Sequence, residues 1–74
     1  MLYLKITKKL WSGIMTFNIP DYIELIMDSL EEKGHEAYIV GGSVRDALLG
    51  RQPKDYDITT DAFPNEIEYI FSDF

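Results

Sequence analysis

Residues 37–60 read AYIVGGSVRDALLGRQPKDYDITT, and this stretch decides the expected fold. The apolar run 37–40 is short enough for a buried strand, and it stops at two glycines. A helix is expected next, because apolar residues recur at helical spacing from Val44 and Gly50 is placed to end it. Residues 55–60 then alternate between polar and apolar side chains, which predicts a half-buried strand. The stretch therefore predicts strand, helix and strand in that order.

The sequence on both sides extends this pattern. Apolar residues at helical spacing predict an amphipathic helix over 20–33, and Pro64 opens a last helix. The expected order is helix, strand, helix, strand, helix, which is an α/β (α+β) domain. Residues 1–17 differ in character, because they contain three lysines and no acidic residue. We expect this segment to be a basic and apolar N-terminal leader or an extra strand, with the domain proper spanning 18–74.

The composition limits the classes of protein that the chain can belong to. A chain of 74 residues allows one small domain. The absence of cysteine excludes disulfides and thiolate metal sites and favours a cytoplasmic location. No run of about 18 apolar residues occurs, so no membrane-spanning helix is expected. Thirteen acidic against seven basic residues give a net charge of -6, which excludes a generally basic nucleic-acid surface.

The glycine turn is the first of two features that indicate chemistry. Glycines let a backbone approach a ligand closely, and unpaired amides at the start of a helix favour phosphate oxygens. Ser43 is expected to cap the helix, and Arg45 is placed to add a charge-assisted contact to the same anion. On its own, a pair of glycines such as Gly41 and Gly42 more often marks only a tight turn beside a solvated arginine.

The second feature is the pair Asp55 and Asp57. A strand period of two places both carboxylates on one face. Two carboxylates on one face repel each other unless a cation lies between them, and hard oxygen ligands select Mg²⁺, which often bridges to substrate phosphates. Alone, the pair is compatible with an exposed polar face. Because Asp55 follows Gly42 by 13 residues, the two features together predict phosphate and a divalent metal in one pocket.

Residues 41–67, GGSVRDALLGRQPKDYDITTDAFPNEI, closely resemble the active-site signature of the class II tRNA nucleotidyltransferase (CCA-adding enzyme) and bacterial poly(A) polymerase family, in the DNA polymerase β-like superfamily. The matching positions occur in order and without a gap; they are Gly41, Gly42, Val44, Arg45, Asp46, Leu48, Leu49, Gly50, Pro53, Asp55, Asp57, Thr60 and Pro64. The resemblance implies a partial polymerase β-like head with a small mixed sheet. Residues 18–74 would then be an incomplete nucleotidyltransferase head domain.

The resemblance also implies site residues and partners. It assigns nucleotide binding to the glycine turn and the arginine after it, namely Gly41, Gly42, Ser43 and Arg45. It makes Asp55 and Asp57 catalytic ligands of Mg²⁺ in a two-metal reaction, in which an RNA 3′-hydroxyl attacks the α-phosphate of CTP or ATP. The RNA is expected to be tRNA, held mainly by later domains. Asp46 matches a family aspartate, but we expect it to have a structural role.

Other readings remain open at this stage. Members of the family are several hundred residues long, and their third carboxylate and base-selecting residues have no counterpart before Phe74, so we expect no turnover from this chain alone. CCA addition to tRNA and poly(A) synthesis are both compatible with the sequence, and CCA addition or repair of tRNA is the preferred interpretation. The sequence does not determine the oligomeric state. A non-catalytic remnant that binds a nucleotide or a partner protein would share the same site residues.

A calcium-binding EF-hand loop is a further alternative. Asp55, Asp57, Thr59 and Glu66 occupy its positions 1, 3, 5 and 12. Against it, Thr60 stands where that loop needs glycine, and Pro64 lies inside the loop. We therefore expect the nucleotidyltransferase reading to account better for these acidic residues.

Overall fold

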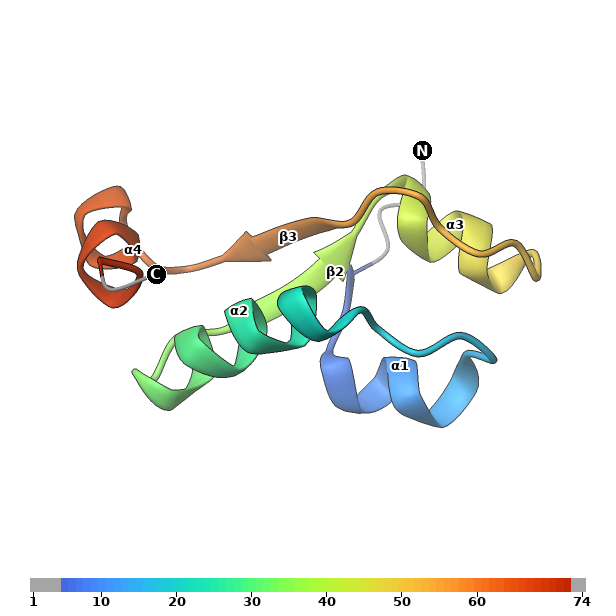
Figure 1. The fold of residues 1–74 in the computed structure, drawn as a ribbon, viewed down its shortest axis with the longest axis horizontal. Coiled ribbons are helices and arrows are strands. Elements are labelled where there is room, and N and C mark those ends of the chain that lie inside the picture. Colours follow the sequence, from blue (N-terminus) through green and yellow to red (C-terminus); the bar gives the residue numbers. More distant parts are fainter. Residues whose placement is uncertain (1–4, 73–74) are drawn as a thin grey trace.

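A computed structural model describes residues 5–72 as an elongated domain with a small sheet and four helices (Figure 1). In chain order the elements are β1 (Lys5–Ile6), α1 (Lys8–Ile14), α2 (Asp21–Glu32), β2 (Ala37–Val40), α3 (Gly42–Leu48), β3 (Asp57–Thr60) and α4 (Pro64–Ile70). From α2 onward, the order helix, strand, helix, strand, helix agrees with the sequence prediction, and the α/β class is confirmed. None of the helices within 5–72 is long and apolar enough to cross a membrane.

The three strands form one sheet in the order β1-β2-β3, with β2 in the centre. Val40 lies opposite Asp57, and Ile39 lies opposite both Ile58 of β3 and Ile6 of β1. Both strand pairs are antiparallel, so the prediction of a mixed sheet was wrong for the described strands. The reason is that the chain reverses direction after α3, so β3 runs beside β2 in the opposite direction (Figure 1).

The segment before α2 contributes a short strand and a helix. Residues 5–6 form a strand that pairs with β2, and an extra strand was one of the two alternatives expected for residues 1–17. The helix α1 follows it and was not predicted. The hydroxyl of Thr7 begins α1 by accepting a hydrogen bond from the backbone nitrogen of Leu10 at 3.1 Å. Only Trp11 is buried on this helix, while Leu10 and Ile14 are about half exposed. The helix is only seven residues long and contains a glycine, so its apolar residues are too few to predict a helix from the sequence.

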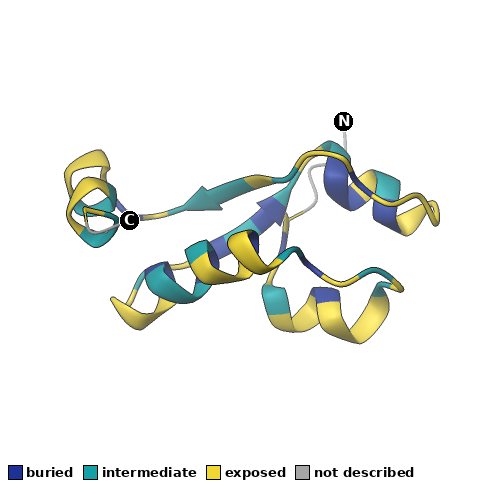
Figure 2. Cartoon of the chain, viewed as in Figure 1, coloured by how far each residue is buried: buried dark blue, intermediate teal, exposed yellow. Residues whose placement is uncertain are grey.

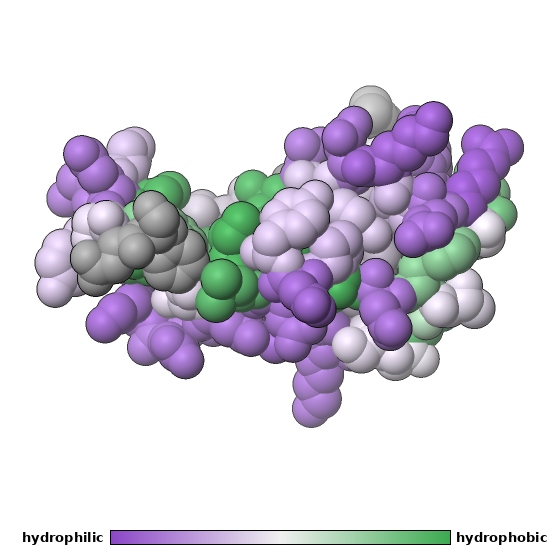
Figure 3. Space-filling model, in the orientation of Figure 1, coloured by the Kyte–Doolittle hydropathy of each residue, from purple (hydrophilic) through white to green (hydrophobic). Residues whose placement is uncertain are grey.

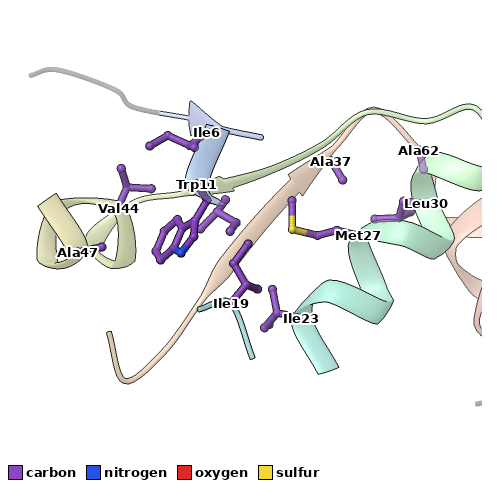
Figure 4. Packing of buried hydrophobic residues seen from close by; sticks show 11 residues of the cluster. Ile6, Trp11, Ile19, Ile23, Met27, Leu30, Ala37, Val44, Ala47 and Ala62 are labelled. Carbon is purple, nitrogen blue, oxygen red and sulfur yellow. The ribbon is translucent and has the colours of Figure 1, made fainter. Parts of the chain in front are cut away.

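The core lies between the sheet and the helices α1, α2 and α3 (Figure 2, Figure 4). Its buried apolar residues are Ile6, Trp11, Ile19, Ile23, Met27, Leu30, Ala37, Ile39, Val44, Ala47 and Ala62. Trp11 is 1% exposed, and its ring nitrogen donates a hydrogen bond to the carbonyl of Phe17 at 2.8 Å. The N-terminal segment therefore packs into the same core as the predicted domain.

Within residues 5–72, the opposite face of the sheet carries side chains that are half-buried or exposed. Because side chains alternate along a strand, Tyr38 and Val40 point away from the core that buries Ile39. The antiparallel register adds Lys5 and Asp57 to this face, since both lie opposite Val40. The ammonium group of Lys5 lies 4.5 Å from the centre of the Tyr38 ring. The strand β3 thus begins with a carboxylate on a solvent-facing surface.

The helix α4 packs at the far end of the sheet through partly buried apolar side chains, and polar contacts also hold it there. His35 lies between two acidic side chains, with Nδ1 3.5 Å from Asp61 and Nε2 3.3 Å from Glu66. Glu66 also accepts a hydrogen bond from the backbone nitrogen of Phe63 at 2.9 Å, which caps α4. The side chain of His35 is therefore largely buried and contacts both acidic residues.

Candidate nucleotide and metal site

The turn between β2 and α3 depends on Gly41. Its backbone angles, φ 77° and ψ -146°, lie in a region that is essentially restricted to glycine. A Cβ atom at this position would lie 3.4 Å from Oδ2 of Asp57. Since Val40 and Asp57 are register partners, the glycine turn starts beside this carboxylate. The turn and the start of β3 are therefore one local unit.

Ser43 does not cap α3 as the sequence analysis expected. The helix begins at Gly42, with Gly41 in the capping position and no side-chain capping bond. Ser43 is 5% exposed, and its hydroxyl donates back to the carbonyl of Val40 at 3.1 Å. The positive φ of Gly41 turns the chain two residues earlier than predicted. Ser43 therefore closes the turn between β2 and α3.

The two carboxylates flank a side chain that is anchored in the core. β3 begins at Asp57, so Asp55 and Tyr56 precede the strand, which was predicted to start at Asp55. The ring of Tyr56 packs near that of Trp11, with centroids 5.7 Å apart. Burial raises the pKa of the Tyr56 phenol above its ordinary value, and the nearby Tyr22 adds to this shift. Tyr56 therefore fixes the backbone between the two acidic residues.

A hollow of about 500 Å³ lies where α3, the connection after it and β3 meet. Its lining residues are Gly42, Ser43, Asp46, Arg51, Gln52, Lys54, Asp55 and Asp57. Figure 3 shows hydrophilic side chains gathered at the end of the molecule that carries α3. The volume is within the usual range for ligand pockets, about 300–1,000 Å³. The glycine turn and both carboxylates thus contribute to one polar hollow.

A second hollow of similar size lies at the other end of the molecule, beside α4. It is lined by residues that include His35, Glu66 and Tyr69. Two of its titratable groups are engaged in holding α4, because Glu66 caps that helix and contacts His35. This hollow lacks both the glycine turn and the paired carboxylates, so the predicted chemistry belongs to the hollow beside α3.

Arg45 does not line the hollow beside α3. Its side chain is 71% exposed, and its Nε lies 3.5 Å from a carboxylate oxygen of Asp46. A Cβ atom on Gly42 would lie 3.3 Å from Nη2 of Arg45, so the guanidinium group lies against the turn. Asp46 was expected to be structural; it pairs with Arg45 and also lines the hollow. The arginine is thus positioned at the rim of the site.

Sequence reasoning missed the contribution of the segment between α3 and β3. Arg51, Gln52 and Lys54 all face the hollow, and none of them was a candidate. Their signal in the sequence is weak, because two basic residues around a proline read as an ordinary turn. Their place directly before the carboxylate pair is the feature by which they could have been found.

The carboxylate pair has the chemistry of a Mg²⁺ site that is completed by its ligand. Within residues 5–72, no hydrogen bond or ion pair occupies the side chain of Asp55 or Asp57. Carboxylate oxygens are the hard donors that Mg²⁺ prefers, and this ion commonly keeps waters and takes further oxygens from phosphates. The described residues hold no cluster of three or more acidic or histidine side chains arranged for a metal. The pair therefore fits a metal shared with a phosphate, not an all-protein cage.

The EF-hand alternative does not agree with this geometry. Residues 57–60, which include Thr59, form a strand paired with β2, whereas an EF-hand needs a loop there. Glu66 caps α4 and contacts His35, while Asp55 lines the hollow beside α3. The four residues with EF-hand spacing therefore do not surround one point.

The glycine turn, the carboxylate pair and their common hollow are features of a nucleotidyltransferase head domain. A family model described as the poly A polymerase head domain matches residues 37–74, about half of the chain. The chain therefore belongs to this family of nucleotidyltransferases.

The proteins similar in sequence to this chain are named either as CCA-adding enzymes or as poly(A) polymerases. A CCA-adding enzyme of Levilactobacillus brevis is 44% identical over 57 residues, which cover 73% of this chain and 14% of the relative. A poly(A) polymerase I of Haemophilus influenzae is 52% identical over 46 residues, or 62% of this chain and 10% of the relative. A CCA-adding enzyme of Staphylococcus aureus is 57% identical over 47 residues, or 64% of this chain and 12% of the relative. The aligned part of the chain thus spans about a tenth to a seventh of the length of these relatives.

Proposed function

We propose that this chain supplies the nucleotide-binding and metal-binding part of an enzyme that adds CMP and AMP, from CTP and ATP, to the 3′ end of tRNA. The observation that carries the proposal is that Gly42 and Ser43 line the same hollow as Asp55 and Asp57. A divalent cation neutralises part of the negative charge of a bound triphosphate. A turn whose backbone can contact phosphate, beside two carboxylates without partners, is therefore suited to bind a triphosphate together with its metal ion.

Each residue of the site has a role that follows from its position. Asp55 and Asp57 would hold Mg²⁺, which supplies positive charge to the triphosphate and to the attacking 3′-hydroxyl when bound. Gly41 and Gly42 keep side chains away from the turn, so that phosphate oxygens reach the backbone. Arg45, at the rim, is placed to contact the nucleotide by charge-assisted hydrogen bonds.

A bacterial poly(A) polymerase is the second candidate. The relative in Haemophilus influenzae carries that name at 52% identity, and a CCA-adding enzyme matches at 57%. Both activities transfer a nucleotide to an RNA 3′-hydroxyl and would use the same carboxylates. The tRNA reading is our first choice, because, of the three relatives described above, the one aligned over most of this chain, 73%, is a CCA-adding enzyme.

Nucleotide binding by the 74-residue chain tests the proposal. We expect CTP to shift amide NMR signals around Gly42 and Asp57, and Mg²⁺ to strengthen this binding. Asp55→Asn and Asp57→Asn should each weaken binding of the CTP–Mg²⁺ complex by about tenfold or more, since each removes a metal ligand. Glu68→Gln is the matched control, because this exposed α4 residue is remote from the hollow. Unchanged binding in both aspartate variants would refute the assignment.

Turnover is a separate question. We expect no incorporation of radiolabelled CTP or ATP into tRNA lacking its 3′ CCA at an enzyme-like rate by the 74-residue chain. The two carboxylates are the only acidic residues of the described part that we assign to catalysis, and the proposed RNA contacts lie in later domains. Incorporation at such a rate would show that these 74 residues are sufficient for catalysis.

A further inference from the structure

The connection between α3 and β3 carries two basic residues whose backbone is fixed by the fold and whose side chains have no ion-pair partner among the described residues. Arg51 and Lys54 both line the hollow that contains Asp55 and Asp57. Neither makes an ion pair within 4.0 Å in the part of the chain that the structure describes, although carboxylates line the same hollow. Two cations left free beside two free carboxylates suggest that a ligand with both negative charge and bound metal completes the site.

The backbone of Arg51 is fixed by the end of α3. Gly50 has φ 78°, and its nitrogen donates to the carbonyl of Ala47 at 3.1 Å. The nitrogen of Arg51 donates to the carbonyl of Asp46 at 2.8 Å. These two bonds form a Schellman motif, which ends the helix with a defined chain direction. The start of the connection is therefore an ordered part of the fold.

The rest of the connection is held at two more points. Pro53 is buried, although its neighbours Gln52 and Lys54 are exposed. Tyr56 packs near Trp11, and Asp57 starts β3. The connection therefore crosses the hollow between fixed ends, which limits the positions that the basic side chains can reach.

We propose that Arg51 and Lys54 bind the terminal phosphates of the nucleoside triphosphate, and so also the pyrophosphate that leaves. This assignment rests on the proposed function, because it needs a triphosphate in the hollow. Asp55 and Asp57 hold the metal-binding side of the hollow, and the two cations provide the counter-charge for the phosphates farthest from the reacting α-phosphate. Arg45 lies at the rim and outside this set.

The class of ligand follows from the charges. An arginine fork and a lysine ammonium suit phosphate oxygens, and side chains placed on the terminal phosphates would make no contact with the base. The pair should therefore recognise a polyphosphate independently of the nucleoside. It should contribute to the binding of CTP, ATP and inorganic tripolyphosphate alike, and little to the binding of CMP.

NMR titration of the 74-residue chain with inorganic tripolyphosphate and Mg²⁺ tests this assignment. We expect the amide signals of Arg51 and Lys54 to shift. The double variant Arg51→Gln with Lys54→Gln should bind tripolyphosphate and CTP at least about tenfold more weakly, since charge-assisted hydrogen bonds are among the strong ones. Its binding of CMP should change by less than about twofold. A double variant with Arg51→Lys in place of Arg51→Gln should recover part of the lost affinity for tripolyphosphate, because lysine restores the charge but not the two-pronged hydrogen bonding of arginine.

Lys9→Gln is the control, because it removes the same charge from an exposed position on α1 outside the hollow. Equal binding of tripolyphosphate by the wild type and the double variant would overturn the assignment. If CTP binding by the wild type still depends on Asp55 and Asp57 in that case, the assignment of the cations alone fails. If neither CTP nor tripolyphosphate binds the wild type, the proposed function fails as well.

Discussion

Replacing Trp11 by alanine removes the largest group of side-chain atoms from the described core. Trp11 is 1% exposed, and a buried tryptophan truncated to alanine typically costs about 3–5 kcal/mol. The cost should lie toward the upper end, because the carbonyl of Phe17 also loses its hydrogen-bond donor. Domains are stable by about 0.05–0.15 kcal/mol per residue, which gives roughly 4–11 kcal/mol for a chain of this length. Trp11→Ala should therefore remove about half or more of the free energy of unfolding.

Urea denaturation followed by far-ultraviolet circular dichroism measures this loss without relying on tryptophan fluorescence. With a slope of about 1 kcal/mol per molar urea, the midpoint should fall by about 3 M or more. Ile14→Ala is the control on the same helix, because Ile14 is 53% exposed. Its midpoint should change by less than about 0.5 M, in keeping with the small effects of surface substitutions.

The milder substitution Trp11→Phe keeps a ring in the core and removes the ring N–H. It should cost about 1 kcal/mol for the hydrogen bond and somewhat more for the smaller ring. Because Tyr56 packs near Trp11, the amide NMR signals of Asp55 and Asp57 should also shift in this variant. A Trp11→Ala midpoint within 0.5 M of the wild type would refute the reasoning, since residues 5–17 would then lie outside the cooperative core.

Two further predictions concern the turn and the effect of alkali. Gly41→Ala should cost about 1–3 kcal/mol in urea denaturation and weaken CTP binding, because alanine is strained at this backbone conformation. Gly34 has φ 83° and open space around it, so the control Gly34→Ala should cost about 1–2 kcal/mol but leave CTP binding unchanged. A Gly41→Ala protein that binds CTP normally would contradict the proposed role of the turn. The hydrogen bond to Asp28 raises the pKa of Lys8, and burial raises the pKa of Tyr56, so the folded state binds both protons more tightly than the unfolded chain. Stability should therefore be fully present below about pH 10 and fall as the pH rises further, and urea midpoints should show a smaller alkaline loss in Tyr56→Phe than in the wild type.

The sequence was sufficient to predict the elements that carry strong local patterns. The apolar run of β2 and the stripe of α2 led to boundaries within one residue of those observed. The helix α1 was missed, because seven residues that include Gly13 give too short and too weak a helical pattern. The pairing direction of the strands was also missed, since it depends on how the chain turns after Gly50 and not on the composition of the strands.

Most residues of the candidate site could be named from the sequence, but the way in which they are arranged could not. The hollow contains four of the six candidate residues, namely Gly42, Ser43, Asp55 and Asp57. The capping role of Ser43 was wrong, because Gly41 starts the helix earlier and the hydroxyl returns to β2. Arg51 and Lys54 were missed, because only their place before the carboxylate pair marks them in the sequence, and their position over the hollow results from the way α3 ends and from the burial of Pro53.

All residues that line the hollow beside α3 fall within residues 42–57. Closing such a short loop costs little chain entropy, so the hollow can form from neighbouring parts of the chain. Proteins fold from the N-terminus as they are synthesised. A nascent chain that has emerged from the ribosome as far as α4 should already shape this hollow, and under the proposed function CTP–Mg²⁺ would then stabilise this early folding unit by mass action.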